Sequence, residues 1–283
     1  MTIWNILTLD HSFYPIPLRH YFSRVRFARE DARVKNFPLQ AFPEVVGALP
    51  MGGAGPVLFA VADAGYFNRF ANIFVSSAAI SSPQSAVHIH VVGVDKAVAL
   101  PLPLIEHLPK HFAVTSETAD FSKMPSGLRS RYCQCMRFIR LAEFVKQTAR
   151  DYVAFDIDGL FQKSFANFAH EFEGDVGLIL RPEFADPGLR VNAGVVFMRE
   201  TAAAQKFMNA ATQHMASHLQ HAPYIEKLDQ RCLALAVDEA VQPLPKSLYG
   251  FEPGQGAFYS AKGSRKNETL VRVFGELRAQ KRA

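Results

Sequence analysis

The sequence has few cysteines and no long hydrophobic stretch, and each shortage excludes a class of protein. Its three cysteines, Cys133, Cys135 and Cys232, argue against a secreted domain held together by disulfides. They also lack the further Cys or His pair of a metal site, so free thiols are expected. No apolar run reaches the roughly 18 residues of a membrane-spanning helix. The N-terminus has no basic segment followed by an apolar one, so we expect no signal peptide and a cytoplasmic location.

A dense basic patch is also missing, although the formal net charge is +5. A nucleic-acid groove usually combines such a patch with aromatic residues, so no nucleic-acid partner is expected. The one local cluster of cations lies near the C-terminus and consists of Arg272, Arg278, Lys281 and Arg282. A phosphorylated small substrate, peripheral association with the inner face of a membrane and a solvated helix end all explain it. The oligomeric state is not indicated.

The composition suits one large α/β domain, because 49% of the residues are hydrophobic and 20% are charged. Residues 1–50 show little periodicity, and "LPMGGAGP" at 49–56 is typical of a turn or linker. These glycines are not a P-loop, because no Gly-Lys-Ser/Thr follows them. We therefore divide the chain into an N-terminal extension, residues 1–50, and a main domain, residues 51–283.

Strand-like and helix-like patterns alternate from residue 57 onward. The expected strands cover residues 57–62, 86–95, 111–116, 152–158, 175–180 and 193–199. The expected helices cover residues 66–81, 130–147, about 200–220 and 224–237. This alternation predicts a mostly parallel sheet with helices on both faces. Such sheets bind ligands beyond the carboxyl ends of their strands, where we expect Asp63, Asp95, Asp156 and Asp158.

Two histidines, His88 and His90, fall inside the expected strand 86–95. Their spacing places both side chains on the same face of the sheet. A metal pair would have this spacing too. Because they lie within the strand rather than at its end, we expect packed, hydrogen-bonded histidines.

The segment "YVAFDIDGLFQ" at 152–162 has two interpretations. Phosphatases similar to haloacid dehalogenase open with an apolar strand and D-x-D-G-T, and their first Asp attacks phosphorus. Here Leu160 replaces that Thr, at least three strands precede the motif, and no later acidic pair completes a magnesium site. The other interpretation is a glycosyltransferase, in which the carboxylates hold a metal against a sugar nucleotide.

Five segments in order favour the glycosyltransferase. They are "FAVADAGYFNRFANIFVSSA", "FIRLAEFV", "VAFDIDGLFQKSF", "VNAGVVFMR" and "YIEKLDQRCL". Together with a later loop they cover about residues 57–266 and resemble glycosyltransferase family 8, which includes glycogenin and bacterial lipooligosaccharide galactosyltransferases. The resemblance implies a GT-A, Rossmann-like fold and a hexosyltransferase of bacterial polysaccharide biosynthesis. It also implies retaining transfer from a UDP-sugar to a glycan or lipid-linked acceptor.

The resemblance further implies roles for particular residues. Asp156 and Asp158 would hold Mn²⁺ or Mg²⁺, which prefers oxygen ligands. Asn192, Asp229 and Gln230 would be catalytic, with Gln230 positioning the far face of the sugar. The expected donor-binding residues are Ala62, Asp63, Tyr66, Arg140, Asp156, Gly263 and Lys266. Arg140 could instead be a surface arginine, Asp229 a helix N-cap and Asn192 a turn residue.

One departure from the family lies in "FYSAKGSRK" at 258–266. The family has His-x-x-Gly-x-x-Lys here, and its histidine is a third metal ligand. This chain keeps Gly263 and Lys266 but has Ser260 at the histidine position. Lys262 and Arg265 could contact the diphosphate or belong to a solvated turn. The missing histidine leaves an alternative open, a catalytically inactive protein that binds sugar nucleotides.

Overall fold

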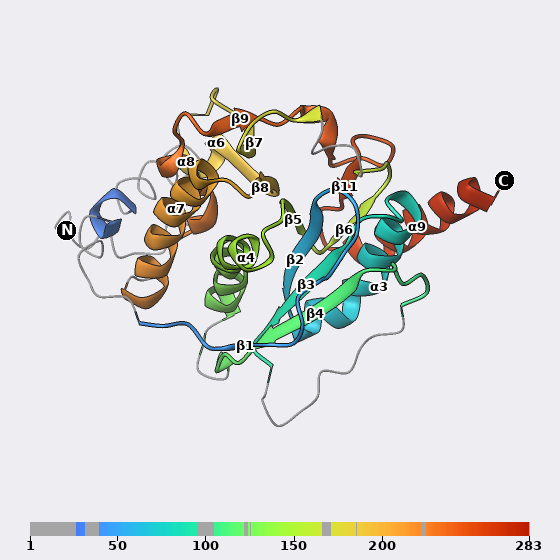
Figure 1. The fold of residues 1–283 in the computed structure, drawn as a ribbon, viewed down its shortest axis with the longest axis horizontal. Helices are drawn as coiled ribbons and strands as arrows, with labels where there is room; N and C mark the ends of the chain where they lie inside the picture. Colours follow the sequence, from blue (N-terminus) through green and yellow to red (C-terminus); the bar gives the residue numbers. More distant parts are fainter. Residues whose placement is uncertain are drawn as a thin grey trace.

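The computed structural model describes residues 27–31, 40–94, 105–121, 124, 126–165, 171–184, 186–221 and 225–282. Its centre is an eight-stranded sheet with the order β1-β4-β3-β2-β5-β8-β7-β9 (Figure 1). The strands are β1 (Val45–Val46), β2 (Val57–Asp63), β3 (Val87–Val92), β4 (Phe112–Glu117), β5 (Tyr152–Asp156), β7 (Val176–Leu180), β8 (Val191–Met198) and β9 (Val241–Pro243). The helices are α3 (Ala64–Ser81), α4 (Ser126–Thr148), α6 (Pro187–Arg190), α7 (Ala202–His221), α8 (Leu228–Ala236) and α9 (Lys266–Arg282). All elements predicted from residue 57 onward are therefore present.

Some predictions fall where the structure makes no description. The expected strand end at Asp95 and most of the N-terminal extension lie outside the described residues. Within that extension, residues 27–31 are helical and β1 pairs with β4. The proposed boundary at residue 50 stays a prediction.

The sheet is mostly parallel, as predicted, but β8 runs against its neighbours. Strands β2, β3, β4 and β5 are parallel to one another. Strand β8 is antiparallel to both β5 and β7, with Phe155 opposite Val195. The first residues of β8 therefore lie at the carboxyl end of β5. This reversal brings the "NAG" segment to the same edge of the sheet as the Asp-x-Asp motif.

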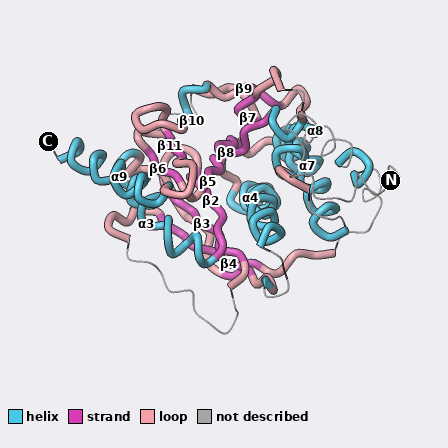
Figure 2. Tube along the Cα trace, turned by 180° about the vertical axis from the view of Figure 1, so that it is seen from behind, coloured by secondary structure: helices cyan, strands magenta, loops and turns pink. Residues whose placement is uncertain are grey.

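Helices cover both faces of the sheet, as predicted (Figures 1 and 2). Alternate residues of β2 face opposite sides, so Leu58 belongs to one core cluster and Phe59 to the other. The first cluster contains side chains of α3 and α9, and the second contains side chains of α4, α7 and α8. Because β2 is buried on both faces, its sequence is a continuous apolar run rather than an alternating one.

A small second sheet lies beside the Asp-x-Asp motif and was not predicted. It has the order β10-β11-β6, with β6 at Gly159–Phe161, β10 at Tyr249–Gly250 and β11 at Phe258–Ser260. Strand β6 follows Asp158 directly, and its Gly159 pairs with Ser260. This pairing brings Ser260 next to a motif about one hundred residues earlier in the chain.

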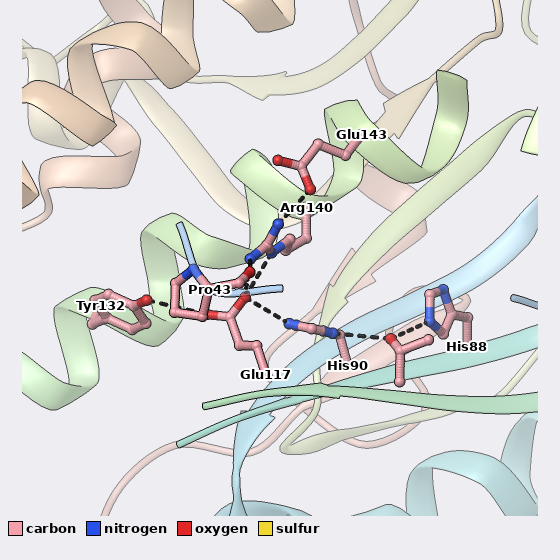
Figure 3. A network of polar contacts seen from close by, with 8 residues as sticks. Pro43, His88, His90, Glu117, Tyr132, Arg140 and Glu143 are labelled. Carbon is pink, nitrogen blue, oxygen red and sulfur yellow. Dashed lines mark hydrogen bonds and ion pairs between the residues drawn. The ribbon is translucent and has the colours of Figure 1, made fainter. Parts of the chain in front are cut away.

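A buried polar network joins β3, β4 and α4 (Figure 3). Thr115 Oγ1 lies 2.8 Å from His88 Nε2 and 2.9 Å from His90 Nδ1. The other ring nitrogen of His90 lies 3.3 Å from Glu117, which also accepts from Arg140 Nε at 2.6 Å. His88, His90 and Glu117 are almost completely buried. The two histidines are packed and hydrogen-bonded, in agreement with the sequence-based expectation.

Acidification is expected to destabilise the protein through His88 and His90. Burial lowers the pKa of both histidines, and the contact with Glu117 only partly offsets this for His90. Histidines in the unfolded chain titrate near pH 6.5, so below that value the unfolded state binds more protons than the folded state. The free energy of unfolding therefore has its full value above about pH 7 and decreases as the pH falls. The decrease is at most about 1.4 kcal/mol per pH unit for each histidine that titrates. The melting temperature should fall between pH 7.5 and pH 5.5.

The control is His88→Phe, which keeps an aromatic ring against Phe144 but has no group that titrates. Its melting temperature should depend less on pH than that of the wild type over the same range. Equal pH dependence in both proteins would contradict the assignment to this network.

The basic C-terminal cluster lies on α9, a helix whose inner face packs in the core. Arg272 forms an ion pair with Glu276, and Arg278 forms one with Glu106 on the exposed surface. These pairs fit the solvated-helix explanation, whereas membrane association stays a prediction. Among the described residues, no helix combines the length and apolarity needed to span a bilayer.

Candidate active site

A cavity of about 540 Å³ opens at the carboxyl ends of β2 and β5. Its volume falls within the roughly 300–1,000 Å³ of small-molecule sites. The predicted site residues that line it are Ala62, Asp63, Tyr66, Asp156, Asp158 and Lys266. The structure thus brings together, at one edge of the sheet, residues from three separate parts of the sequence.

The first wall of the cavity is the junction between β2 and α3. Asp63 is the N-cap of α3, and its carboxylate accepts from the backbone N–H of Tyr66 at 2.7 Å. The carboxylate satisfies a backbone donor that has no partner inside the helix. The cap leaves Tyr66 partly exposed beside the cavity.

Lys266 connects this wall to the Asp-x-Asp motif. Its ammonium donates to Asp158 Oδ2 at 2.6 Å and to the Tyr66 hydroxyl at 2.9 Å. It also lies 4.7 Å from the centre of the Tyr66 ring and 5.4 Å from that of Phe70. Burial alone would lower the pKa of Lys266, but the hydrogen bonds to Asp158 and Tyr66 outweigh it and raise the pKa. Lys266 is therefore a fixed positive charge in the cavity.

Arg137, which the sequence did not single out, contacts the other carboxylate of the motif. Its guanidinium forms an ion pair with Asp156 and lies 3.7 Å from Asp229 Oδ2. The arginine side chain is 6% exposed. Burial alone would lower the pKa of Arg137, but Asp156 and Asp229 outweigh it and raise the pKa. Arg137 therefore stays charged between two acidic residues that come from β5 and α8.

The arginine predicted from sequence, Arg140, lies elsewhere on the same helix. Its guanidinium contacts Glu117, Glu143 and the carbonyl of Pro43 (Figure 3). It does not line the cavity. Positions three apart on a helix lie on nearly the same side, so the sequence did not distinguish Arg137 from Arg140. We correct the assignment: Arg137 is the arginine at the Asp-x-Asp motif.

Asp229 and Gln230 lie near the start of α8. Asp229 is 3% exposed, and its Oδ1 has no well-aligned hydrogen-bond partner among the residues that the structure describes. Burial raises the pKa of Asp229, although Arg137 partly offsets this. The N-cap of α8 is Lys227, so the alternative of Asp229 as an N-cap is wrong.

The side-chain amide of Gln230 faces two backbone carbonyls, and we assign its nitrogen to that side because only the nitrogen can donate to them. It donates to Gly188 at 2.9 Å and to Val191 at 2.7 Å. These bonds hold the junction between α6 and β8 against α8. Gln230 is thus placed to position the start of β8.

The "NAG" segment begins β8. Asn192 Oδ1 accepts from the backbone N–H of Gly194 at 2.9 Å, as a turn residue does. A Cβ at Gly194 would lie 2.6 Å from the Tyr249 hydroxyl. The glycine therefore leaves room for Tyr249, which packs from the second sheet.

Tyr249 and Ser260 form a buried pair of hydroxyls near Asp156. Within the described ranges, neither hydroxyl has a well-aligned hydrogen-bond partner. Burial and then Asp156 raise the pKa of Tyr249, whereas the neighbouring Ser260 hydroxyl lowers it. The residue at the position of the family's histidine is therefore neutral and buried.

These residues fit a divalent cation poorly. Asp156 and Asp158 each already pair with a side-chain cation, and a buried serine, Ser260, replaces the histidine that is the family's third ligand. Within the described part of the chain, no three His, Cys, Asp or Glu side chains are grouped as metal ligands. The predicted Mn²⁺ or Mg²⁺ ion stays a prediction. Of the remaining predicted residues, Gly263 adopts a left-handed φ of +85° in the loop before α9.

Comparisons with known proteins agree with this architecture. No protein-family model matches the chain, and no curated protein matches it. It is similar to the solved structure of an active-site mutant of LgtC, with 13% identity and a TM-score of 0.53. That alignment covers 78% of this chain and 95% of the LgtC chain.

A second similarity is to the glycosyltransferase GlyE of Streptococcus pneumoniae TIGR4. The identity is 10%, the TM-score is 0.48, and the alignment covers 80% of this chain and 63% of GlyE. The apo form of GlyE gives 11% identity and a TM-score of 0.49 over the same shares. Membership of family 8 stays a prediction. The architecture and the LgtC comparison together show that the chain has a GT-A-like glycosyltransferase fold.

Proposed function

We propose that the protein transfers a sugar from a nucleotide-diphosphate donor, a UDP-sugar, to a glycan or lipid-linked acceptor. The observation that supports this best is one cavity with two ion pairs, Arg137 with Asp156 and Lys266 with Asp158. It lies at the carboxyl edge of the sheet, where open α/β folds bind nucleotides. The fold shared with LgtC is consistent with this proposal.

The reaction moves charge onto the leaving diphosphate. The bond between the anomeric carbon and a diphosphate oxygen breaks, and the diphosphate keeps the electron pair. The acceptor's hydroxyl oxygen bonds to that carbon, and its proton passes to the departing diphosphate or to water. Positive groups held in place stabilise the developing charge without having to reorganise. Arg137 and Lys266 are such groups, because their carboxylate partners hold them in place and raise the pKa of each.

The resemblance to family 8 implies that the reaction retains the configuration at the anomeric carbon. The residues of α8 that the resemblance makes catalytic, Asp229 and Gln230, would then act in one of two ways, as a nucleophile or by positioning other groups. The Gln230 amide bonds two backbone carbonyls, and an amide is a poor nucleophile. We therefore propose that Gln230 positions the "NAG" segment at the sugar rather than attacking it. The buried carboxylate of Asp229 helps to orient Arg137 through the terminal nitrogen that does not contact Asp156.

Calorimetric titration with UDP, UMP and inorganic phosphate tests the proposal. UDP is expected to bind at least about tenfold more tightly than UMP, because its β-phosphate reaches the cations at the motif. Incubation with a panel of UDP-sugars and glycan acceptors should release UDP. A protein that binds no nucleoside diphosphate would rule out the proposal.

The same measurements separate the alternatives. Tight UDP binding without release of UDP from any donor indicates the inactive sugar-nucleotide-binding protein. Release of phosphate from an aryl phosphate, lost in Asp156→Asn, indicates the phosphatase. The structure gives that interpretation no support, because Asp156 ends the fourth of four parallel strands and already pairs with Arg137.

A further inference from the structure

We propose that side-chain cations take the place of a divalent metal ion at this Asp-x-Asp motif. In this arrangement Asp156 and Asp158 orient Arg137 and Lys266, which bind the donor's diphosphate directly. The inference rests on the proposed function, because it concerns how the same site holds a nucleoside diphosphate. Four contacts and charges support it.

The first support is the number of contacts that hold Lys266 at Asp158. The ammonium lies 2.6 Å from Asp158, 2.9 Å from the Tyr66 hydroxyl and over the rings of Tyr66 and Phe70. Both side chains of this pair are mostly buried, with 22% of Lys266 and 18% of Asp158 exposed. A metal ion at Asp158 would have to displace an ammonium that is bound from several sides.

The second support is the arginine at Asp156. A guanidinium stays protonated at all ordinary pH values, so Arg137 cannot become neutral when a metal ion approaches. Its other terminal nitrogen lies 3.7 Å from Asp229 Oδ2. A divalent ion bound to Asp156 would therefore sit beside a fixed positive charge.

The third support is the position where the resemblance predicts a histidine. Ser260 is completely buried beside the hydroxyl of Tyr249, and its own side chain is a hydroxyl in place of the imidazole. Hard divalent cations are held mainly by carboxylates, carbonyls and water. A neutral hydroxyl supplies no negative charge to offset the repulsion from Arg137 and Lys266.

The fourth support is positive charge elsewhere in the cavity lining that forms no ion pair with another described residue. Lys262 lies 5.1 Å over the ring of Phe251, and Arg129 donates to the carbonyl of Met124. Neither contact neutralises the cation. Counting only described residues, four basic side chains (these two, Arg137 and Lys266) line the cavity against three acidic ones, and one of the acidic residues, Asp63, caps α3. The lining therefore matches an anion without help from a metal.

The test is UDP titration by calorimetry after metal removal, in EDTA and again with excess Mn²⁺. We expect the Kd of the wild type to change less than about threefold between the two conditions. Lys266→Met should weaken binding in EDTA at least about tenfold, because it removes a charge-assisted contact to phosphate. Lys281→Met changes an exposed lysine near the far end of α9 and should bind like the wild type.

Asp158→Asn distinguishes the two arrangements most sharply. If Asp158 binds a metal, this variant loses UDP affinity, and EDTA abolishes binding to the wild type. If Asp158 only orients Lys266, the variant has the same UDP affinity in EDTA as in excess Mn²⁺, because the amide oxygen of asparagine can still accept from the ammonium and no metal ion is involved. Paramagnetic resonance of Mn²⁺ gives an independent readout, since the free-ion signal should not fall when protein is added without nucleotide.

Two outcomes overturn the inference, and they differ in what they say of the proposed function. UDP binding that requires Mn²⁺ and is weakened by Asp158→Asn rejects the substitution of side-chain cations but keeps the glycosyltransferase. Absence of UDP binding in both conditions rejects the proposed function itself and the inference with it.

Discussion

Replacing Arg137 with methionine is expected to lower UDP affinity about a hundredfold and the free energy of unfolding by about 3–5 kcal/mol. The substitution leaves Asp156 and the buried Asp229 near one another without the cation between them. Breaking a buried ion pair from one side is costly, because the remaining charge has no partner. Burial already raises the pKa of Asp229 despite Arg137, so the variant should hold this carboxyl protonated. Urea unfolding and UDP calorimetry measure the two effects.

Arg140→Met is the matched control for this prediction. Arg140 lies one turn further along α4, is equally buried and also pairs with a buried acid, Glu117. Its loss should cost a similar amount of stability but leave UDP affinity within about threefold of the wild type. Loss of UDP binding in Arg140→Met with normal binding in Arg137→Met would restore the assignment made from sequence. Arg137→Lys keeps the charge but replaces the guanidinium, whose two terminal nitrogens contact Asp156 and Asp229, with a single ammonium. Its free energy of unfolding should therefore lie between those of Arg137→Met and the wild type.

Gly159→Ala is expected to destabilise the protein by about 3 kcal/mol although it adds one methyl group. A Cβ at this position would lie 2.3 Å from Phe258 Cζ and 2.7 Å from the carbonyl oxygen of Tyr259. Phe258 is completely buried and packs on Phe155 and Phe161, and the carbonyl belongs to the backbone of β11. Neither neighbour can move without shifting β11 against β6. Because Asp158 precedes Gly159, UDP affinity should fall as well, by about tenfold.

Gly275→Ala controls for the general effect of adding a methyl group to a glycine. Gly275 lies in α9, and a Cβ there would meet no atom within 4 Å. Alanine favours helix over glycine, so this variant should gain about 0.5–1 kcal/mol. Chemical unfolding of both variants gives the comparison. A stability for Gly159→Ala equal to the wild type would mean that β6 and β11 do not pair as closely as described.

Local patterns in the sequence were sufficient for most elements of the main domain. Strand β2 is buried on both faces, so its apolar run identified it without reference to the rest of the chain. Apolar runs also showed that the Asp-x-Asp motif lies at the end of a strand and that His88 and His90 lie inside one. The motifs "NAG" and "DQ" each consist of consecutive residues, so they can be recognised in the sequence. Their order along the chain, after the Asp-x-Asp motif, indicated the fold.

Contacts between distant segments could not be predicted in this way. Lys266 reaches Asp158 across 108 residues, and Ser260 pairs with Gly159 across a similar separation. Because β8 runs antiparallel to β5, its first residues, the "NAG" segment, lie beside the last residues of β5. Periodicity reports which face of an element is buried, but it does not report which partner covers that face.

The sequence by itself determined the alternation of strands and helices and the chemistry available at the strand ends. The tertiary structure decided which cation pairs with which carboxylate. Arg137 and Arg140 lie on the same helix with nearly the same orientation, and only the positions of Asp156 and Glu117 on different strands separate them. The physical reason is that an ion pair depends on the distance between two side chains, and for residues on different elements that distance is set by packing.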